Sequence, residues 1–260
     1  MTNNTLSISI IMPALNEEDN IHEAITNTLK AFTDLDIDGE VIVINDGSTD
    51  KTPEIVSKVS AEDNRVRLIN HDNPQGIGAS FWDGVDNAVG NAVCMLPGDN
   101  ENDPLETLRY FMLLEHVDIV IPFVFNKEVR SIFRNGLSYL YRFIINTTFL
   151  VNFNYTNGTV IYRRSILSEL THKSKGFFFQ TDILIRTVKR GYLFAEVPYR
   201  LKARNSGTSK AVSFPSLIQV IKGYIRLFKE IYSDKAVIEN QFSVDSQTQL
   251  RRSQRDKKDE

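Results

Sequence analysis

Val41-Ile42-Val43-Ile44-Asn45-Asp46-Gly47-Ser48 joins an apolar, β-branched run to an abrupt polar stop. A short apolar run of this kind is typical of a strand that is buried on both faces, and the Asn-Asp-Gly-Ser sequence after it favours a turn. A helix is predicted around residues 52–60, with Ser48 or Asp50 as its cap. The stretch therefore predicts a unit of strand, loop and helix.

The same unit recurs along the first hundred residues. A first strand is predicted at residues 8–12, ending at Pro13, and an amphipathic helix follows it. A third strand is predicted at 66–69 with a helix at 78–89, and a fourth strand at 92–96 is broken by Pro97-Gly98. Strands and helices that alternate at this spacing predict a doubly wound, mostly parallel sheet.

Three carboxylates follow three of the predicted strands: Glu17, Asp46 and Asp99. Ligands of doubly wound sheets bind at the carboxyl ends of the strands. For any one of these acids alone, a loop turn or a helix cap is the favoured explanation, and a type I turn is the alternative for Asp46. Three acids at the same edge of one sheet predict a ligand site there.

The chain has 260 residues, of which 42% are hydrophobic, enough for one α/β domain. We expect that domain to span residues 1–232, followed by a polar, disordered tail over 233–260. Cys94 is the single cysteine and excludes an internal disulfide. Neither a signal peptide nor an apolar run of about 20 residues is evident, so a cytoplasmic location without a spanning helix is expected.

Charge is distributed unevenly along the chain. Residues 1–110 hold 20 acidic and 6 basic side chains, whereas residues 111–260 hold 13 acidic and 24 basic ones. The segment 189–229 has nine basic residues and one acidic residue. Such a patch attracts phosphate groups, but the net charge of -3 and the lack of a recognisable binding module argue against nucleic acid as a partner.

Several short motifs occur in a fixed order at characteristic separations. They are Met12-Pro13-Ala14-Leu15-Asn16-Glu17, residues 43–50, Gln75-Gly76-Ile77-Gly78-Ala79, residues 99–104, Thr156-Asn157-Gly158 with Tyr162-Arg163-Arg164, Gly191-Tyr192 with Glu196-Val197-Pro198, and residues 204–210. In combination they resemble family-2 glycosyltransferases, and within them the dolichyl- or polyprenyl-phosphate sugar synthases. The resemblance covers about residues 7–232. It implies a single α/β domain with the GT-A fold, a Rossmann-like, mostly parallel sheet with helices on both faces.

The resemblance also implies a nucleotide-sugar donor, either GDP-mannose or a UDP-sugar. A nicotinamide cofactor is disfavoured, because Phe81 stands where the dinucleotide fingerprint has its third glycine. The resemblance implies that Glu17 lines a nucleoside pocket and that the Asp46 carboxylate accepts hydrogen bonds from the base or the ribose. It also implies that Gly76 and Gly78 let the backbone approach the nucleotide closely. The donor-binding residues implied are Pro13, Ala14, Glu17, Asp46, Gly76, Gly78, Asp99, Arg204 and Lys210.

The metal motif of the family is an Asp-x-Asp, which this chain carries as Pro97-Gly98-Asp99. By the resemblance, Asp99 is the second Asp of the motif, and Glu101 offers another oxygen to Mg²⁺ or Mn²⁺. Pro97 replaces the first Asp. Asp103-Pro104 is interpreted as a helix start instead of a ligand pair.

The remaining implied residues concern the chemistry of transfer. Residues 204–210 resemble the family's Arg-x-x-Gly-x-Ser-Lys loop, which suits a phosphate clamp; the alternative is a solvated basic turn. Asp182 falls at an acidic position of the family, where it acts as a general base or orients the acceptor, or is only a helix N-terminal acid. The catalytic set implied is Asp99, Asp182, Arg204 and Lys210, and the acceptor-phosphate set is Ser209, Arg130 and Arg134.

Residues 213–232 have the pattern of an amphipathic helix with Lys222, Arg226 and Lys229 on its polar face. The helix either packs on the core of its own domain or lies on a membrane surface. The second alternative implies a peripheral protein on the cytoplasmic face of a membrane, or one that a membrane subunit recruits.

The expected function is inverting transfer of a sugar from a nucleotide sugar to a polyprenyl or dolichyl phosphate. One alternative is a family-2 transferase that uses a saccharide hydroxyl in cell-surface polysaccharide synthesis. Another is a nucleotide-sugar-binding subunit without catalysis, because Pro97 replaces a metal ligand.

Overall fold

Strand β2 (Asp38–Asn45) lies inside the sheet because both of its faces are apolar. In the computed structural model, which describes residues 6–126, 132–200, 214–233 and 242–259, the side chains from Val41 to Ile44 are fully buried. Ile42 and Ile44 belong to the core on one face of the sheet, and Val41 and Val43 to the core on the other. The alternation places β2 between two helical layers.

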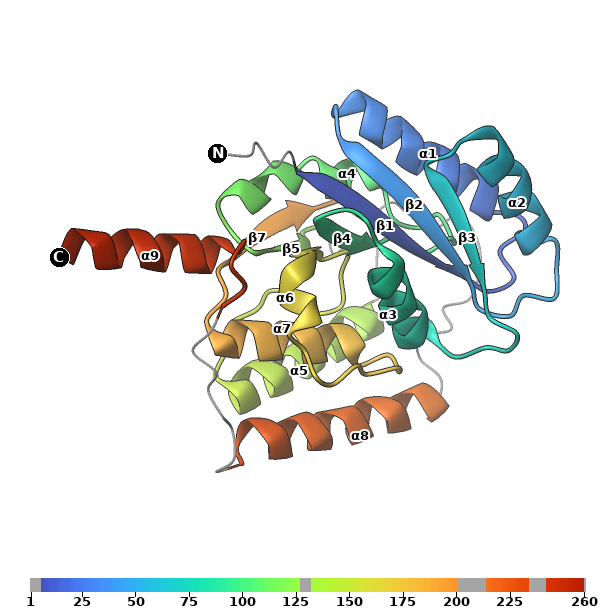
Figure 1. The fold of residues 1–260 in the computed structure, drawn as a ribbon. Helices are drawn as coiled ribbons and strands as arrows, with labels where there is room; N and C mark the ends of the chain where they lie inside the picture. Colours follow the sequence, from blue (N-terminus) through green and yellow to red (C-terminus); the bar gives the residue numbers. More distant parts are fainter. Residues whose placement is uncertain (1–5, 127–131, 201–213, 234–241, 260) are drawn as a thin grey trace.

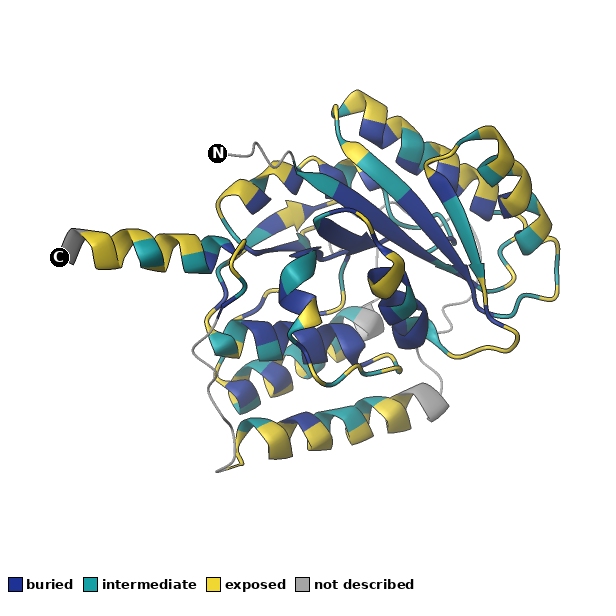
Figure 2. Ribbon diagram, viewed as in Figure 1, coloured by how far each residue is buried: buried dark blue, intermediate teal, exposed yellow. Residues whose placement is uncertain are grey.

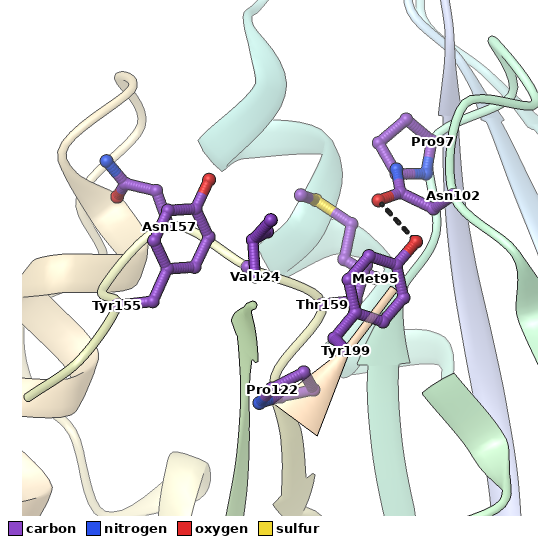
Figure 3. Close-up of a pocket in the computed structure, with 10 residues that line it drawn as sticks. Met95, Pro97, Asn102, Pro122, Val124, Tyr155, Asn157, Thr159 and Tyr199 are labelled. Atoms are coloured by element: carbon purple, nitrogen blue, oxygen red, sulfur yellow. Dashed lines mark hydrogen bonds between the residues drawn. The ribbon is translucent and has the colours of Figure 1, made fainter. Parts of the chain in front are cut away.

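The described strands form one seven-stranded sheet in the order β3-β2-β1-β4-β6-β5-β7. Their bounds are β1 Ser7–Ala14, β2 Asp38–Asn45, β3 Val66–Asn70, β4 Ala92–Met95, β5 Ile119–Val124, β6 Ile161–Arg163 and β7 Phe194–Tyr199. Strand β6 runs antiparallel to β4 and β5, and every other pairing is parallel. The expected mostly parallel sheet is confirmed. The carboxyl ends of β4, β5 and β7 surround a small cavity, drawn in Figure 3.

Helices cover both faces of the sheet, as expected (Figure 1). Their bounds are α1 Ile21–Asp34, α2 Thr52–Glu62, α3 Ile77–Asn87, α4 Pro104–Leu108, the 3-10 helix η1 Phe111–Glu115, α5 Ile132–Phe149, α6 Arg164–Ser168, α7 Phe179–Arg190, α8 Phe214–Ile231 and α9 Gln247–Asp259. One face of the sheet is covered by α1, α2, α4 and η1. The other face is covered by α3 and by the helices from α5 to α8. Figure 2 shows the buried sheet between these layers. Among the described helices, none has the length and apolar character needed to cross a membrane.

The C-terminal segment corrects one expectation. A disordered tail was predicted over 233–260, but residues 242–246 pack on the domain and α9 follows them. Phe242 is buried against the ring of Tyr192, and Ser246 and Thr248 are buried as well. The prediction was wrong because it relied on the polar composition, whereas a few contacts are enough to fix the start of this segment. The rest of α9 projects into solvent (Figure 1).

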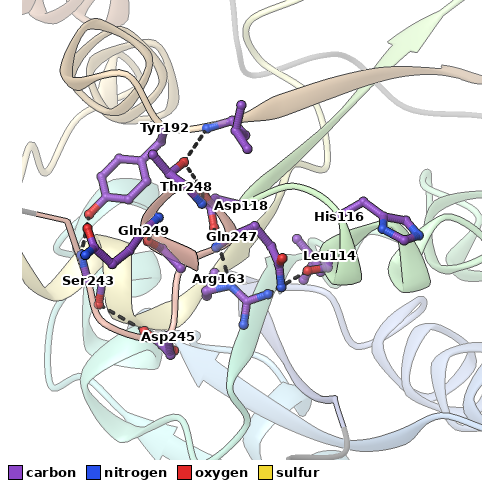
Figure 4. Close-up of polar contacts among 12 residues, drawn as sticks. Leu114, His116, Asp118, Arg163, Tyr192, Ser243, Asp245, Gln247, Thr248 and Gln249 are labelled. Atoms are coloured by element: carbon purple, nitrogen blue, oxygen red, sulfur yellow. Dashed lines mark hydrogen bonds and ion pairs between the residues drawn. The ribbon is translucent and has the colours of Figure 1, made fainter. Parts of the chain in front are cut away.

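The start of α9 is held by the buried carboxylate of Asp118 (Figure 4). One oxygen accepts the backbone N–H of Gln247 at 2.6 Å, and the other accepts both the N–H of Thr248, at 3.1 Å, and its hydroxyl. Arg163 forms an ion pair with the same carboxylate at 3.5 Å and donates to the carbonyl of Leu114 at 2.6 Å. Asp118 thus caps a helix that is distant in sequence, because helix N-termini leave N–H groups without partners.

Asp118→Ala should lower the free energy of unfolding by about 3 kcal/mol, because it removes this cap and leaves Arg163 buried without its counter-charge. Urea denaturation measures the change. Asp245→Ala is the matched control: this residue is exposed in the same segment and bonds to Ser243, so its change should stay within about 0.5 kcal/mol. Equal midpoints for Asp118→Ala and the wild type would contradict the assignment.

Candidate active site

The carboxyl ends of β1, β2 and β4 meet at one edge of the sheet. The N–H of Asp46 donates to the carbonyl of Ala14 at 2.8 Å, and the N–H of Gly98 donates to that of Pro13 at 3.0 Å. A Cβ at Gly98 would lie 2.7 Å from the terminal methyl of Ile21 and 3.3 Å from Cβ of Ala14, so a larger residue there would displace the Ile21 side chain. The structure therefore brings together three predicted segments, those of Pro13 and Ala14, of Asp46, and of Asp99.

Asp46 is buried, and both of its carboxylate oxygens bond to the loop after β3. Oδ1 accepts the N–H of Gln75 at 2.7 Å and lies 2.8 Å from Nδ1 of His71, and Oδ2 accepts the N–H of Gly76 at 2.9 Å. The side chain thus holds the loop 71–76 in place, which a residue that only made a turn would not do. Its predicted contact with a nucleoside stays a prediction.

The two predicted glycines have a visible structural role. Gly76 has φ +97°, in the left-handed region that favours glycine, immediately before α3. A Cβ at Gly78 would lie 2.6 Å from backbone atoms of Lys175, whose carbonyl accepts the Gly78 N–H at 3.0 Å. Close packing of the segment around Lys175 accounts for glycine at position 78, and the predicted approach of a nucleotide remains a prediction.

Glu17 is half-buried in the turn that begins α1. Its carbonyl accepts the N–H of Ile21 at 2.8 Å, and its own N–H donates to the hydroxyl of Thr52 at 2.9 Å. Neither predicted cap is the N-cap of α2: that residue is Lys51, and no side chain caps the helix from there. Asp50, one residue earlier, accepts the N–H of Thr52 at 3.0 Å, whereas Ser48 accepts the N–H of Asn16. Burial alone raises the pKa of Asp50, but the hydrogen bonds from Thr52 outweigh it and lower that pKa.

A cavity of about 80 Å³ opens beside these strand ends (Figure 3). The hydroxyl of Tyr199 on β7 accepts the N–H of Asp103 at 3.1 Å and donates to Asn102 at 3.4 Å. Tyr155, Asn102 and Tyr199 were not predicted as site residues, although Asn102 lies within the motif at 99–104 and the other two lie next to the motifs at 156–158 and 196–198. The lining residues are Met95, Pro97, Asn102, Pro122, Val124, Tyr155, Asn157, Gly158, Thr159 and Tyr199.

The predicted metal residues lie in one turn after β4. Oδ1 of Asp99 accepts the N–H of Glu101 at 3.1 Å, and Asp103 caps α4 by accepting the N–H of Leu105 at 3.0 Å, which confirms that interpretation. Within the described part of the chain, no three His, Cys, Asp or Glu side chains are grouped to hold a metal. The two hard oxygen donors fit Mg²⁺ or Mn²⁺ only if other ligands complete the coordination.

Asp182 lies on α7, where it is 3% exposed. Its Oδ2 accepts from Nε of Arg186 at 3.0 Å, and Arg186 also pairs with Glu230 on α8. Burial raises the pKa of the Asp182 carboxyl, and the hydrogen bond from Arg186 opposes that rise. Thr181, one residue earlier, bonds to Asn157 of the cavity wall at 3.2 Å. The Asp182 side chain therefore takes part in the contact between α7 and α8, whereas Thr181 contacts the wall of the cavity.

Part of the predicted phosphate-binding set cannot be placed. Arg130, Arg204, Ser209 and Lys210 lie outside the described residues, and Arg134 belongs to α5 with its side chain outside them.

A family model described as Glycosyl transferase family 2 matches residues 9–171. The chain belongs to glycosyl transferase family 2. The match spans β1 to α6 and so includes every strand end that forms the site except that of β7. The family expected from the motifs is confirmed.

Curated relatives of this family-2 chain were also found. It is 28% identical over 218 residues to the undecaprenyl-phosphate 4-deoxy-4-formamido-L-arabinose transferase of Salmonella choleraesuis, which covers 82% of this chain and 65% of that protein. An uncharacterized glycosyltransferase of Haemophilus influenzae is 36% identical over 113 residues, 42% of this chain and 44% of that protein. An uncharacterized glycosyltransferase of Synechocystis sp. is 33% identical over 100 residues, 38% and 31% of the two chains. The family-2 chain therefore spans about one third to two thirds of the length of these relatives.

Solved structures share the fold of the family-2 chain. Glucosyl-3-phosphoglycerate synthase from Mycobacterium tuberculosis in complex with UDP has a TM-score of 0.67 at 21% identity, over 86% of this chain and 80% of that one. The same synthase with Mn²⁺, UDP-glucose and phosphoglyceric acid has a TM-score of 0.66 at 21% identity, with the same coverage. The likeness confirms the expected GT-A fold.

Asp46→Ala should lower the free energy of unfolding by about 2 kcal/mol, because the N–H groups of Gln75 and Gly76 lose a buried acceptor. Thermal or urea unfolding measures the loss. Asp72→Ala removes an exposed carboxylate from the same loop and should leave stability nearly unchanged. If both variants unfold like the wild type, Asp46 does not hold the loop.

Proposed function

We propose that this chain transfers a sugar, with inversion, from a nucleotide sugar to a polyprenyl phosphate at a membrane surface. The observation that carries the proposal is an exposed apolar surface on α5 and α8, on the same face of the sheet as α7, which reaches the cavity. A water-soluble saccharide acceptor does not require such a surface. The name of the Salmonella relative, which includes an undecaprenyl phosphate, supports the same acceptor class.

Helix α8 has two apolar stripes instead of one. Leu227 is fully buried, and Val220, Tyr224 and Ile231 pack beside it on the core. A second stripe is exposed by 40–55%, although apolar side chains favour burial. It consists of Leu217, Ile218, Ile221, Ile225 and Phe228, and Tyr232 extends it directly after the helix. The two alternatives for this helix are therefore compatible: it packs on its own domain and still offers an apolar surface.

Helix α5 lies beside α8 and exposes further apolar side chains. Tyr224 and Tyr232 of the α8 segment contact Phe149 of α5, with ring centroids 5.8 and 6.4 Å apart, and the Tyr224 hydroxyl bonds to that of Thr148 at 2.8 Å. The exposed apolar residues of α5 are Leu137, Tyr139, Leu140, Phe143 and Ile144. Two adjacent helices with apolar surfaces and exposed cations favour an anionic membrane as the surface that they contact.

The donor would lie at the edge where the Asp46 and Asp99 segments meet. The complexes of the Mycobacterium synthase with UDP-glucose and Mn²⁺, and with UDP and Mg²⁺, support a nucleotide-sugar donor and a divalent ion for this fold. Asp99 and Glu101 would hold that ion together with the donor diphosphate. When bound, it would neutralise charge on the departing diphosphate.

In the proposed reaction, an oxygen of the acceptor phosphate attacks the anomeric carbon of the donor. The new C–O bond forms as the bond to the nucleoside diphosphate breaks, so the anomeric carbon inverts and the diphosphate leaves as an anion. The acceptor phosphate is already ionised near neutral pH, so no base has to remove a proton. Arg204 and Lys210 would stabilise the leaving diphosphate, and Ser209, Arg130 and Arg134 would hold the acceptor phosphate.

Nucleotide sugars with Mn²⁺ should raise the melting temperature of the protein, because a ligand that binds only the folded state stabilises it. A panel of UDP- and GDP-sugars identifies the donor. Asp99→Asn should abolish the part of the shift that depends on Mn²⁺ and keep the part due to the nucleoside. Asp34→Asn, an exposed change on α1, is the control, and equal shifts in Mn²⁺ and in chelator would contradict the metal site.

Asp182→Asn separates the acceptor classes. With a polyprenyl phosphate, turnover should fall by less than about tenfold, whereas loss of a required general base costs about 100-fold or more. The assay uses a short polyprenyl phosphate and the donor found above, and circular dichroism confirms folding, because Arg186 loses its buried partner. A loss of about 100-fold in a folded variant would instead favour a saccharide hydroxyl. No turnover of any acceptor by the wild type would favour a binding subunit.

Membrane binding should be peripheral and salt-sensitive. Changing Lys222, Arg226 and Lys229 together to Glu should weaken co-sedimentation with anionic vesicles at low salt, since each cation contributes about 1 kcal/mol near the surface. The matched control changes Lys30, Lys51 and Lys58 to Glu on the opposite face of the sheet, and should still bind. If the wild type does not bind anionic vesicles at low salt, this surface contacts a protein partner instead.

A further inference from the structure

His71 directly follows β3, and its ring lies between two carboxylates from different elements. Nδ1 is 2.8 Å from Oδ1 of Asp46 at the end of β2, and Nε2 is 2.9 Å from Oδ2 of Asp83 on α3. The side chains of His71 and Asp46 are only 6% and 8% exposed, so water has little access to their contact, whereas the Asp83 side chain is 43% exposed. Asp46 and Asp83 are the charged groups that the described elements bring against the ring.

The geometry discriminates between the two charge states of the ring. The Asp46 carboxylate accepts from two backbone N–H groups as well, so Nδ1 of His71 must carry a proton to donate to it. In a neutral ring, Nε2 would then present its lone pair to Asp83 at 2.9 Å, which is repulsive. In a charged ring, Nε2 carries a proton and the contact is attractive. This second contact has the distance of an ion pair without the alignment of a hydrogen bond, so its strength depends on charge.

The charge of His71 therefore acts on the loop that Asp46 holds. Asp46 fixes the N–H groups of Gln75 and Gly76, and α3, which carries Asp83, begins at the next residue. We propose that His71 is a positioning residue that makes donor binding sensitive to pH: its charged ring holds the loop 71–76 between β2 and α3, and loss of the proton loosens that loop.

This inference rests on the proposed function, because it takes the loop as part of the donor site. Histidine is the side chain whose charge ordinarily changes between about pH 5 and about pH 8. The diphosphate diester of a nucleotide sugar keeps its charge over that range, so such a probe does not itself cause a pH dependence. Donor affinity should thus fall as pH rises and His71 becomes neutral.

Isothermal titration with UDP-glucose and GDP-mannose in Mg²⁺, from about pH 5.5 to about pH 8.5, tests the proposal. The affinity of the wild type should fall by about tenfold across the range, and the profile of His71→Asn should be flat. Asp83→Asn should reduce the dependence and keeps the buried imidazole in case His71→Asn fails to fold. Asp86→Asn is the matched control on the same helix: its carboxylate pairs with Lys173 at 2.7 Å, so its profile should follow the wild type.

A second measurement is independent of the donor. Hydrogen-exchange protection factors for the Gln75 and Gly76 amides should fall with rising pH in the wild type and in Asp86→Asn, but not in His71→Asn. If neither nucleotide sugar binds the wild type, the proposed donor is wrong and the exchange data still decide the role of His71. The same pH dependence in the wild type and in both His71→Asn and Asp83→Asn, in binding or in exchange, would overturn the inference.

Discussion

The parallel pairing of β1, β2, β3 and β4 is the constraint on which the site depends. Parallel strands end at the same edge, and here their backbone hydrogen bonds continue past the strands: Asp46 bonds to Ala14, and Gly98 to Pro13. Polar residues that are separated by tens of positions in the chain are thereby held side by side. The buried carboxylate of Asp46 then fixes the loop after β3 without a cation from Lys or Arg among its described contacts, through backbone N–H groups and His71.

Helix α7 links the cavity to the layer that we propose contacts the membrane. At its start, Thr181 bonds to Asn157 of the cavity wall, and one turn later Arg186 joins Asp182 to Glu230 of α8. A buried carboxylate is tolerated there because the guanidinium is its partner. The same helix therefore connects the cavity wall to the outer helix, whose inner stripe is buried and whose outer stripe remains apolar and exposed.

Sequence patterns predicted the sheet because their signals are local. Buried β-branched runs such as 41–44, each followed by a polar turn, favour the strands of a parallel sheet, and their alternation with helical segments supports the same arrangement. The cap at Asp103 was likewise predictable, since its side chain bonds to the N–H groups two and three residues later in the chain. The motifs also indicated the family, which the match over residues 9–171 confirms.

The sequence by itself thus determined the fold class, the family and the edge of the sheet at which the predicted site residues meet. Only the tertiary structure decided which partners each polar group takes. Asp46 bonds to the loop after β3 and to His71, and Asp182 pairs with the guanidinium of Arg186. Asp118 caps α9, although it lies 129 positions before Gln247. No local pattern contains these pairings, because they join groups from different elements whose approach is set by the packing of the helices on the sheet. The amphipathic pattern of α8 likewise could not say which of its apolar residues face inward, since that depends on the neighbours α5 and α7.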